Sequence, residues 1–109
     1  MGKFVKGEVV VVHLPFSDLS NTKRRPALVI ASLAGDDVIL CQITSKSISD
    51  DYSIPLELGD FENGTITQSS NIRPNRLFTA DSNIILYQAG KIKSGKLREV
   101  VNKIIEIIN

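Results

Sequence analysis

Residues 23–31 limit the possible folds of this chain more than any other stretch. Three cations at 23–25 precede Pro26, and a run of small and branched apolar residues follows. Such a run favours a buried β-strand. Because proline has no N–H to donate, Pro26 is expected at the first residue of this strand or on a sheet edge. The residue before a proline is pushed towards extended geometry, so Arg25 is expected at the mouth of the strand, with its guanidinium reaching outwards.

The cations at 23–25 have two interpretations. A charge fixed at the end of a rigid strand is well placed to act on a ligand. Charged residues also keep exposed strand edges soluble. Both interpretations stay open for Lys23 and Arg24, whereas the neighbouring proline favours ligand binding for Arg25.

Several further segments have the pattern of strands. Branched and alternating apolar residues predict strands at 7–14, 25–32, 38–44 and 87–92, an edge strand at 54–58 with Pro55, and extended chain at 65–69 and at 70–79, which Pro74 interrupts. Turn-forming residues predict loops at 15–22, 45–53 and 59–64. Asp81 is expected to cap a helical turn over 82–86.

The C-terminus changes to a helical period. Ser94 is a candidate N-cap, and apolar residues follow at spacings of three and four, at 97, 100, 101, 104, 105 and 108. This pattern predicts an amphipathic helix packed on a sheet. Five to seven short strands with one terminal helix predict a mainly β fold, either a small curved barrel or a half-open sheet.

Length and composition set the general class. A chain of 109 residues with 42% apolar residues suffices for a single domain, 1–109, with one core. No run is long enough to span a membrane and no signal peptide is evident, so we expect a cytoplasmic protein without a membrane partner. Cys41 lies in an apolar segment and is expected to be a buried, inert thiol. One histidine and one cysteine cannot form a structural zinc site, so we expect no cofactor and metal-free chemistry, or at most an ion held by carboxylates.

Charge and side-chain type suggest an anionic ligand. The net charge is only +1, which argues against bulk binding of nucleic acid, but a local basic patch suits a small anionic footprint. Guanidinium and hydroxyl donors suit the oxygens of a phosphodiester, and such donors occur near strand ends at Arg25, Thr44, Ser45, Arg73 and Arg76. Thr44 and Ser45 equally fit an ordinary polar strand end. A lone histidine such as His13 is more typical of packing than of catalysis.

Five segments resemble the MazF/PemK toxin family. They are Gly-Glu-Val-Val-Val-Val at 7–12, Pro-Phe-Ser-Asp-Leu-Ser at 15–20, Lys-Arg-Arg-Pro-Ala-Leu-Val-Ile at 23–30, Gln-Ile-Thr-Ser at 42–45 and Ile-Arg-Pro-Asn-Arg-Leu-Phe-Thr at 72–79. The resemblance extends from residue 5 to about residue 105 and includes the position of the C-terminal helix.

The resemblance implies both a fold and a function. The fold would be an SH3-like β-barrel of the CcdB/PemK type. The function would be that of a type II toxin–antitoxin endoribonuclease, which works as a homodimer and cuts single-stranded RNA without a metal. Arg25 and Thr44 correspond to the family's catalytic residues. The residues assigned to RNA binding are Ser17, Lys23, Arg24, Ser45, Asn71, Arg73 and Arg76. An acidic, partly disordered antitoxin tail is the implied protein partner.

The chain departs from the family pattern at two places. Many members carry an aspartate soon after the Ile-Arg step, whereas Pro74 and Asn75 follow that step here and the next acid is Asp81. The first strand often ends in an acid, where this chain has His13. The RNA motif is therefore left unassigned. Two alternatives stay open, a gyrase-poisoning toxin of the same fold and a non-cleaving adaptor, although the apolar end at 107–109 does not resemble a protruding peptide ligand.

Overall fold

The computed structural model describes residues 4–15, 22–66 and 68–109. Within them the strands are β1 (Glu8–Pro15), β2 (Thr22–Ser32), β3 (Asp37–Thr44), β4 (Ile54–Leu56), β5 (Phe61–Gly64), β6 (Ser70–Asp81) and β7 (Ile85–Ile92). Two short 3₁₀ turns, η1 (Leu58–Asp60) and η2 (Ser82–Ile84), precede β5 and β7, and the helix α1 (Ser94–Ile108) follows β7.

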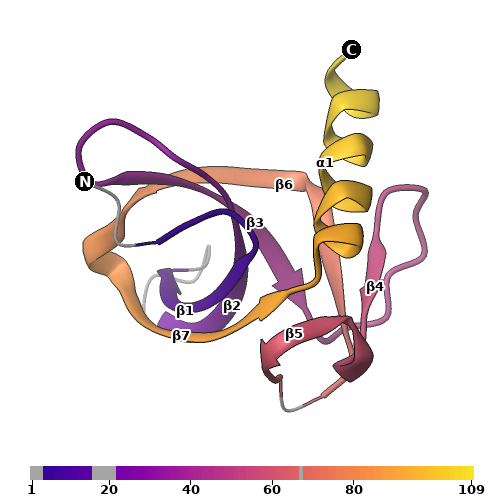
Figure 1. Cartoon of the computed structure of the whole chain (residues 1–109), viewed down its shortest axis with the longest axis horizontal. Coiled ribbons are helices and arrows are strands. Elements are labelled where there is room, and N and C mark those ends of the chain that lie inside the picture. The colour runs from indigo at the N-terminus through magenta and orange to yellow at the C-terminus, as the bar shows by residue number, and fades with distance from the viewer. Residues whose placement is uncertain (1–3, 16–21, 67) are drawn as a thin grey trace.

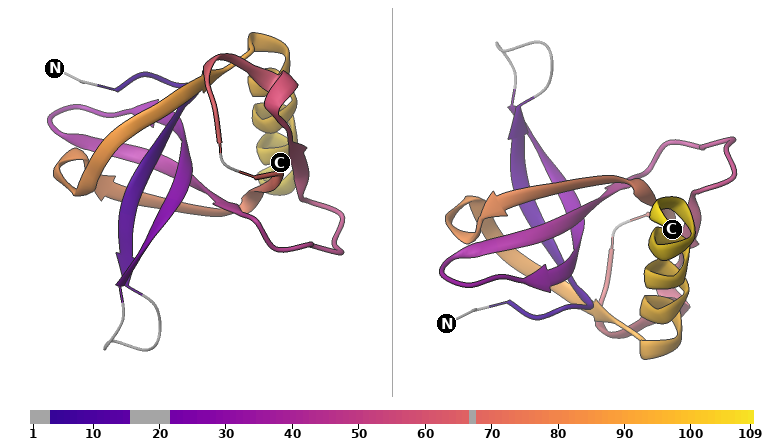
Figure 2. Two further views of the ribbon diagram at one scale, coloured as in Figure 1. Left: turned by 90° about the horizontal axis from the view of Figure 1, so that it is seen from below. Right: turned by 90° about the horizontal axis from the view of Figure 1, so that it is seen from above.

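The strands form one antiparallel sheet that curls into a half-barrel. Its order is β4-β6-β3-β2-β1-β7-β5, so the N-terminal strands β1, β2 and β3 lie inside the sheet and the edge strands β4 and β5 come from the middle of the chain. Figure 1 shows the curl, with α1 standing beside β6 and β4. Figure 2 shows the β1–β2 ribbon projecting from the body of the molecule. The prediction of a mainly β, strongly curved sheet with a C-terminal helix is confirmed.

The central strands are buried on both faces. Val9 and Leu28 belong to the cluster that includes Val100 and Ile104 of α1. Their sequence neighbours, such as Val10 and Val29, belong to a second cluster on the opposite face. Successive strand residues point to opposite faces, so a strand buried on both faces needs a continuous apolar run. This explains why β1 and β2 carry consecutive branched residues instead of an alternating pattern.

The helix packs through part of its apolar face. Val100 and Ile104 are buried, but Ile105 and Ile108 are 51% and 74% exposed, so the predicted apolar face extends beyond the contact with the sheet. The expected N-cap was one residue too late: Lys93 holds that position and Ser94 begins the helix. Lys93 donates its N–H to the carbonyl oxygen of Asp60 at 2.8 Å, and this contact holds it extended.

Pro26 does not begin its strand. It lies inside β2 and is paired with Val11 of β1. The ladder to β3 starts only at Ala27, opposite Gln42, so at Pro26 the other side of β2 is an edge. Because β3 is not paired with Pro26, an N–H missing on the β3 side of the strand removes no ladder hydrogen bond. The predicted loop at 15–22 was also too long, because its two end residues belong to β1 and β2 and the residues between them lie outside the described part of the chain.

The segment after β4 differs most from the prediction. Residues 59–64, expected as a loop, contain most of η1 and all of β5, because Phe61 is buried and pairs with Ile92. The described residues of 65–69, expected as extended chain, lie outside the strands. Two expectations are confirmed: β4, which contains Pro55, is an edge strand, and the Asp81 side chain caps η2 by accepting from the Asn83 N–H at 2.8 Å.

Candidate functional site

Strand β6 changes register at Pro74. Cys41 of β3 pairs with Leu77, whereas the next residue, Gln42, pairs with Arg73, so the ladder passes over residues 74–76. Side chains three positions apart on a regular strand point to opposite faces. The bulge breaks this alternation, and both Arg73 and Arg76 line the same cavity.

This cavity, named here the basic pocket, has a volume of about 160 Å³. Its lining residues are Arg25, Gln42, Ile43, Thr44, Lys46, Ile48, Arg73 and Arg76. The four cations in this set come from β2, from the loop after β3 and from β6. Cations that converge from separate elements favour an anionic ligand.

Arg25 and Thr44 meet in the basic pocket because of the strand register. The β2–β3 ladder ends at the pair of Ala27 with Gln42, and Arg25 and Thr44 each lie two residues beyond that pair, where both line the pocket. The hydroxyl oxygen of Thr44 accepts the N–H of Lys46 at 3.1 Å. Because that bond uses the oxygen as an acceptor, the hydroxyl proton can still be donated to a ligand.

The 45–53 loop beside the pocket is tied to β6 at two points. The Asn71 side chain donates Nδ2 to the carbonyl oxygen of Lys46 at 3.1 Å. The Arg73 guanidinium donates Nη2 to Oδ2 of Asp50 at 3.2 Å. The other oxygen of Asp50 accepts the N–H groups of Ser53 and Tyr52. These backbone donors, with Arg73, hold the pKa of Asp50 below its usual value.

Arg73 is also fixed from inside the molecule. The Cys41 thiol donates to the carbonyl oxygen of Arg73 at 3.0 Å, and burial raises the pKa of this thiol to about 12. The burial predicted for Cys41 is confirmed. Within the described residues, Nε of Arg73 is buried and has no hydrogen-bond partner. An unsatisfied buried donor beside a cavity suits an acceptor oxygen supplied by a ligand.

A second and larger cavity adjoins the basic pocket. We name it the β7 pocket; its volume is about 460 Å³. It shares Arg25 and Ile43 with the basic pocket. Its other lining residues are Val11, Arg24, Pro26, Ser45, Thr65, Ile66, Gln68, Ser70, Tyr87, Gln88 and Ala89.

The structure brings together most of the residues singled out in the sequence. Arg25, Thr44, Arg73 and Arg76 line the basic pocket, and Arg24 and Ser45 line the β7 pocket. Asn71 reaches the edge of the site through its bond to the 45–53 loop. Ser17 and the side chain of Lys23 lie outside the described residues.

Sequence reasoning missed Lys46, Asp50 and Tyr87. Lys46 and Asp50 stand in a polar segment where nothing distinguishes a pocket residue from a solvated one. Asp50 could have been noticed as a turn-forming residue, because an aspartate side chain often accepts the backbone N–H groups two and three residues later, which here belong to Tyr52 and Ser53.

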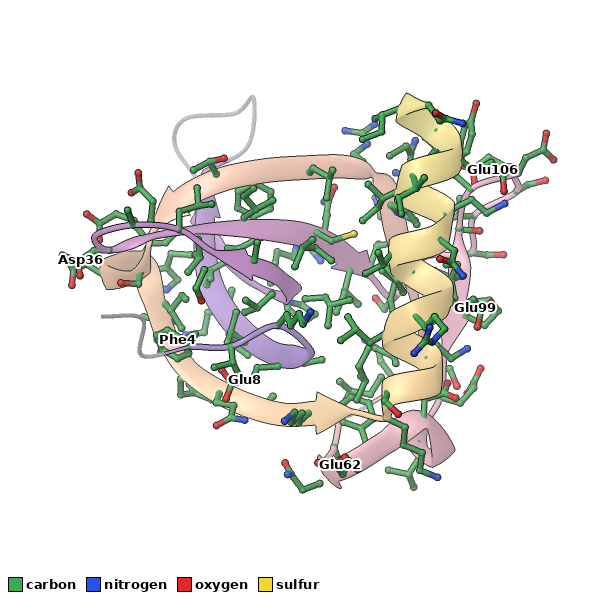
Figure 3. All side chains as sticks on the ribbon, turned by 45° about the horizontal axis from the view of Figure 1, so that its top comes forward. Phe4, Glu8, Asp36, Glu62, Glu99 and Glu106 are labelled. Carbon is green, nitrogen blue, oxygen red and sulfur yellow. The ribbon has the colours of Figure 1, made fainter. Side chains whose placement is uncertain are left out.

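Many acidic side chains lie away from the two pockets. Figure 3 shows Asp36 at the tip of the β2–β3 hairpin, with Glu99 and Glu106 on α1. A chain of almost zero net charge thereby presents a locally positive site.

Residues 5–108 match the family of PemK-like, MazF-like toxins of type II toxin–antitoxin systems. The chain belongs to this family. A comparison with curated protein sequences gives no significant match.

Solved structures of an endoribonuclease and of two MazF proteins share this fold. One is an endoribonuclease in complex with its cognate antitoxin from a Mycobacterial species, with a TM-score of 0.77 at 10% identity over 96% of this chain and 94% of the other. A second is MazE–MazF from Deinococcus radiodurans, with a TM-score of 0.75 at 20% identity over 96% and 95%. A third is the Mycobacterium tuberculosis toxin MazF-mt6, with a TM-score of 0.72 at 15% identity over 93% and 95%.

In the described part of the chain, the helix is too short and too polar to cross a bilayer. No three side chains among the histidines, cysteines, aspartates and glutamates of that part converge in the manner of a metal site.

Proposed function

We propose that the chain is a sequence-selective endoribonuclease toxin that cuts single-stranded RNA at the basic pocket, inhibits translation and so arrests growth from within the cytoplasm. The observation that carries this proposal is the presence of Arg25 and Thr44 in one pocket with three further cations. Membership of the MazF/PemK family supports it.

The reaction we propose uses a nucleophile that RNA itself supplies. The 2′ oxygen attacks the adjacent phosphorus while the bond from phosphorus to the 5′ oxygen breaks. Water accepts the proton of the 2′-OH and supplies the proton that the leaving 5′ oxygen gains, so the products are a 2′,3′-cyclic phosphate and a 5′-OH. The protein has to hold the phosphate in line and stabilise the charge that develops on it, and neither task needs a metal.

Arg25 and Thr44 have separate roles in this mechanism. A guanidinium stays protonated at physiological pH, so Arg25 serves as a charged donor that stabilises the phosphorane oxygens and the leaving oxygen. Thr44 donates its hydroxyl proton to a phosphate oxygen and orients the group. Lys46, Arg73 and Arg76 attract the phosphate and balance its charge.

Two protein partners belong to the proposal. The basic pocket suits an acidic, partly disordered antitoxin tail that folds when it binds and competes with RNA. Two of the similar structures contain an antitoxin with its toxin. A second copy of this chain is the other partner, and the exposed Ile105 and Ile108 of α1 support such an apolar contact. Sedimentation of the purified protein would test the homodimer.

Cleavage in the presence of EDTA tests the enzymatic proposal. Purified protein should cut single-stranded RNA and leave 5′-OH ends, and a single 2′-deoxy substitution at the cut site should abolish cleavage there. Arg25→Ala should lower kcat by about a hundred-fold or more, the usual cost of losing one transition-state donor. Thr44→Val, which keeps the shape and loses the hydroxyl, should also be impaired.

The control variant is Arg98→Ala, which removes an exposed arginine from α1 without touching either pocket. Its activity should equal that of the wild type. Full activity of Arg25→Ala would contradict the proposal. Gyrase-dependent DNA breaks without RNA cleavage would favour the gyrase-poisoning alternative, and an inert protein would favour the adaptor.

A further inference from the structure

The β7 pocket has a lining that differs from that of the basic pocket. Its positive charge comes from two neighbouring residues of β2, Arg24 and Arg25. Elsewhere it combines apolar walls, such as Ile66, with the two side-chain amides of Gln68 and Gln88. At about 460 Å³ it lies within the usual range of small-ligand sites, roughly 300–1,000 Å³. The pocket therefore suits a flat apolar group with polar edges that is attached to an anion.

Tyr87 stands at the mouth of this pocket. It lines the cavity and is 51% exposed, so its ring presents free surface to a ligand. Tyr87 pairs with Val11 of β1, and the β1–β7 ladder shifts register on the C-terminal side of Val11 as well as between Val9 and Val10. Such irregularities re-aim side chains relative to a regular ladder.

Two glycines allow β5 and β7 to approach closely beside this pocket. Gly64 of β5 has φ of +73° and packs against the backbone of Ala89 and Gly90, where a side chain would not fit. A Cβ at Gly90 would lie 2.6 Å from the carbonyl oxygen of Asn63. This close approach brings Thr65 beside Ala89, its N–H donating to the Ala89 carbonyl, and both residues line the pocket. The pocket is therefore a consequence of how β5 crosses β7.

Arg25 connects the two pockets because it lines both. An RNA chain whose cleaved phosphate lies in the basic pocket has a nucleotide directly next to that phosphate. The base of this nucleotide has aromatic faces for a tyrosine ring, and in single-stranded RNA its edges are open to hydrogen bonding by side chains. Side-chain amides carry both a donor and an acceptor and can pair with such edges.

We propose that the β7 pocket binds the nucleobase next to the cleaved phosphate, with Tyr87 stacking on its face and Gln68 and Gln88 selecting its identity. This inference rests on the proposed RNA cleavage. It assigns to these three residues the choice of base at one position of the cut site.

Mapping the cuts in a random-sequence RNA pool tests the assignment. Wild-type protein and Tyr87→Ala are each incubated with the pool, and sequencing of the new 5′-OH ends gives the base frequencies at every position around the cut. Tyr87→Ala should lose the preference at one position next to the cut and keep the others. Its kcat/KM should fall by about ten-fold, as for a lost base stack. Gln88→Ala and Gln68→Ala should change the preferred base at that same position.

Three variants separate stacking from folding. Tyr87→Phe keeps the ring and should behave as wild type, whereas Tyr87→Leu keeps the apolar bulk and should behave as Tyr87→Ala. Tyr52→Ala removes a tyrosine that is 42% exposed and lies outside both pocket linings, so its cuts should not change. An unchanged preference in Tyr87→Ala and Tyr87→Leu, or an equal loss at all positions, would overturn the inference.

A binding measurement distinguishes failure of this inference from failure of the proposed function. Fluorescence anisotropy with a labelled pool of single-stranded RNA decamers reports binding even if nothing is cut. Binding without cleavage would refute the endoribonuclease proposal, and an approximately ten-fold weakening in Tyr87→Ala would still support the base pocket. Equal binding by wild type and Tyr87→Ala would refute the base pocket alone. Absence of binding by wild type would refute both.

Discussion

Asp50 joins the 45–53 loop to the basic pocket through both oxygens of its carboxylate. One oxygen accepts the N–H groups of Ser53 and Tyr52, at 2.9 and 3.0 Å, and the other accepts from Arg73 at 3.2 Å. A protonated carboxyl accepts these bonds poorly, so folding lowers the pKa of Asp50. Such a group stabilises the folded state above its unfolded-state pKa, and this contribution is lost as the pH falls through the lowered pKa.

An acid titration followed by NMR should therefore move the amide signals of Tyr52 and Ser53 together. We expect a midpoint below the usual aspartate value of 3.8. Asp50→Asn should abolish this transition, whereas Asp51→Asn should leave it in place. A midpoint at or above the usual value would show that the loop does not depend on the Asp50 carboxylate.

Cys41 gives a second prediction at the level of one side chain. The thiol is fully buried, and its pKa of about 12 leaves roughly one molecule in ten thousand as thiolate at pH 8. Disulfide reagents at that pH should therefore not label the native protein, and should label it stoichiometrically in denaturant. Rapid labelling without denaturant would mean that β3 and β6 separate readily.

The glycines of β5 and β7 act at the level of the elements. Gly90→Ala would place a methyl group 2.6 Å from the Asn63 carbonyl oxygen, so β5 must move away from β7. We expect a loss of at least about 2 kcal/mol in the free energy of unfolding, because backbone cannot yield as a flexible side chain can. Chemical denaturation of the variant measures this loss.

Gly95→Ala is the matched control. A Cβ at Gly95 has open space around it, and alanine in place of glycine favours a helix. Its free energy of unfolding should rise by about 0.5–1 kcal/mol. Equal changes in the free energy of unfolding for Gly90→Ala and Gly95→Ala would mean that β5 and β7 leave room for a methyl group at Gly90.

The predictability of each strand depended on where its partners lie. The branched runs of β1, β2 and β3 require burial on both faces, so residue type alone indicated them. β5 contains Phe61 followed by polar residues and a glycine, and pairing with Ile92 over a distance in the sequence makes it a strand. Pro74 indicated that the pairing of β6 with its neighbour is interrupted, but not how many residues of β6 would be left unpaired.

The predictability of the site residues also depended on where their partners lie in the sequence. Arg25 and Thr44 could be paired from the family resemblance, and each lies two residues beyond the end of the β2–β3 ladder at Ala27 and Gln42. Tyr87 had no comparable signal, because it comes next to Val11, and through Val11 near Pro26, by pairing of strands that are far apart in the sequence. A residue whose role depends on such long-range pairing cannot be predicted from its sequence neighbours.

At the scale of the whole molecule, charge placement matters more than total charge. The net charge is +1, yet four cations line the basic pocket. Binding of single-stranded RNA releases counterions in proportion to the phosphates neutralised, with a slope of about −0.7 per phosphate in a plot of log K against log salt. If these cations contact about three phosphates, the slope should be about −2.

Substitutions should change this slope according to position and not according to charge alone. Arg76→Ala should weaken RNA binding and make the slope shallower by about 0.7, because one phosphate contact is lost. Arg98→Ala lowers the net charge by the same amount but alters α1, away from both pockets, so its slope should match the wild type. Equal changes in the two variants would mean that RNA responds to the overall charge of the molecule, and the basic pocket would then lose its role as the phosphate site.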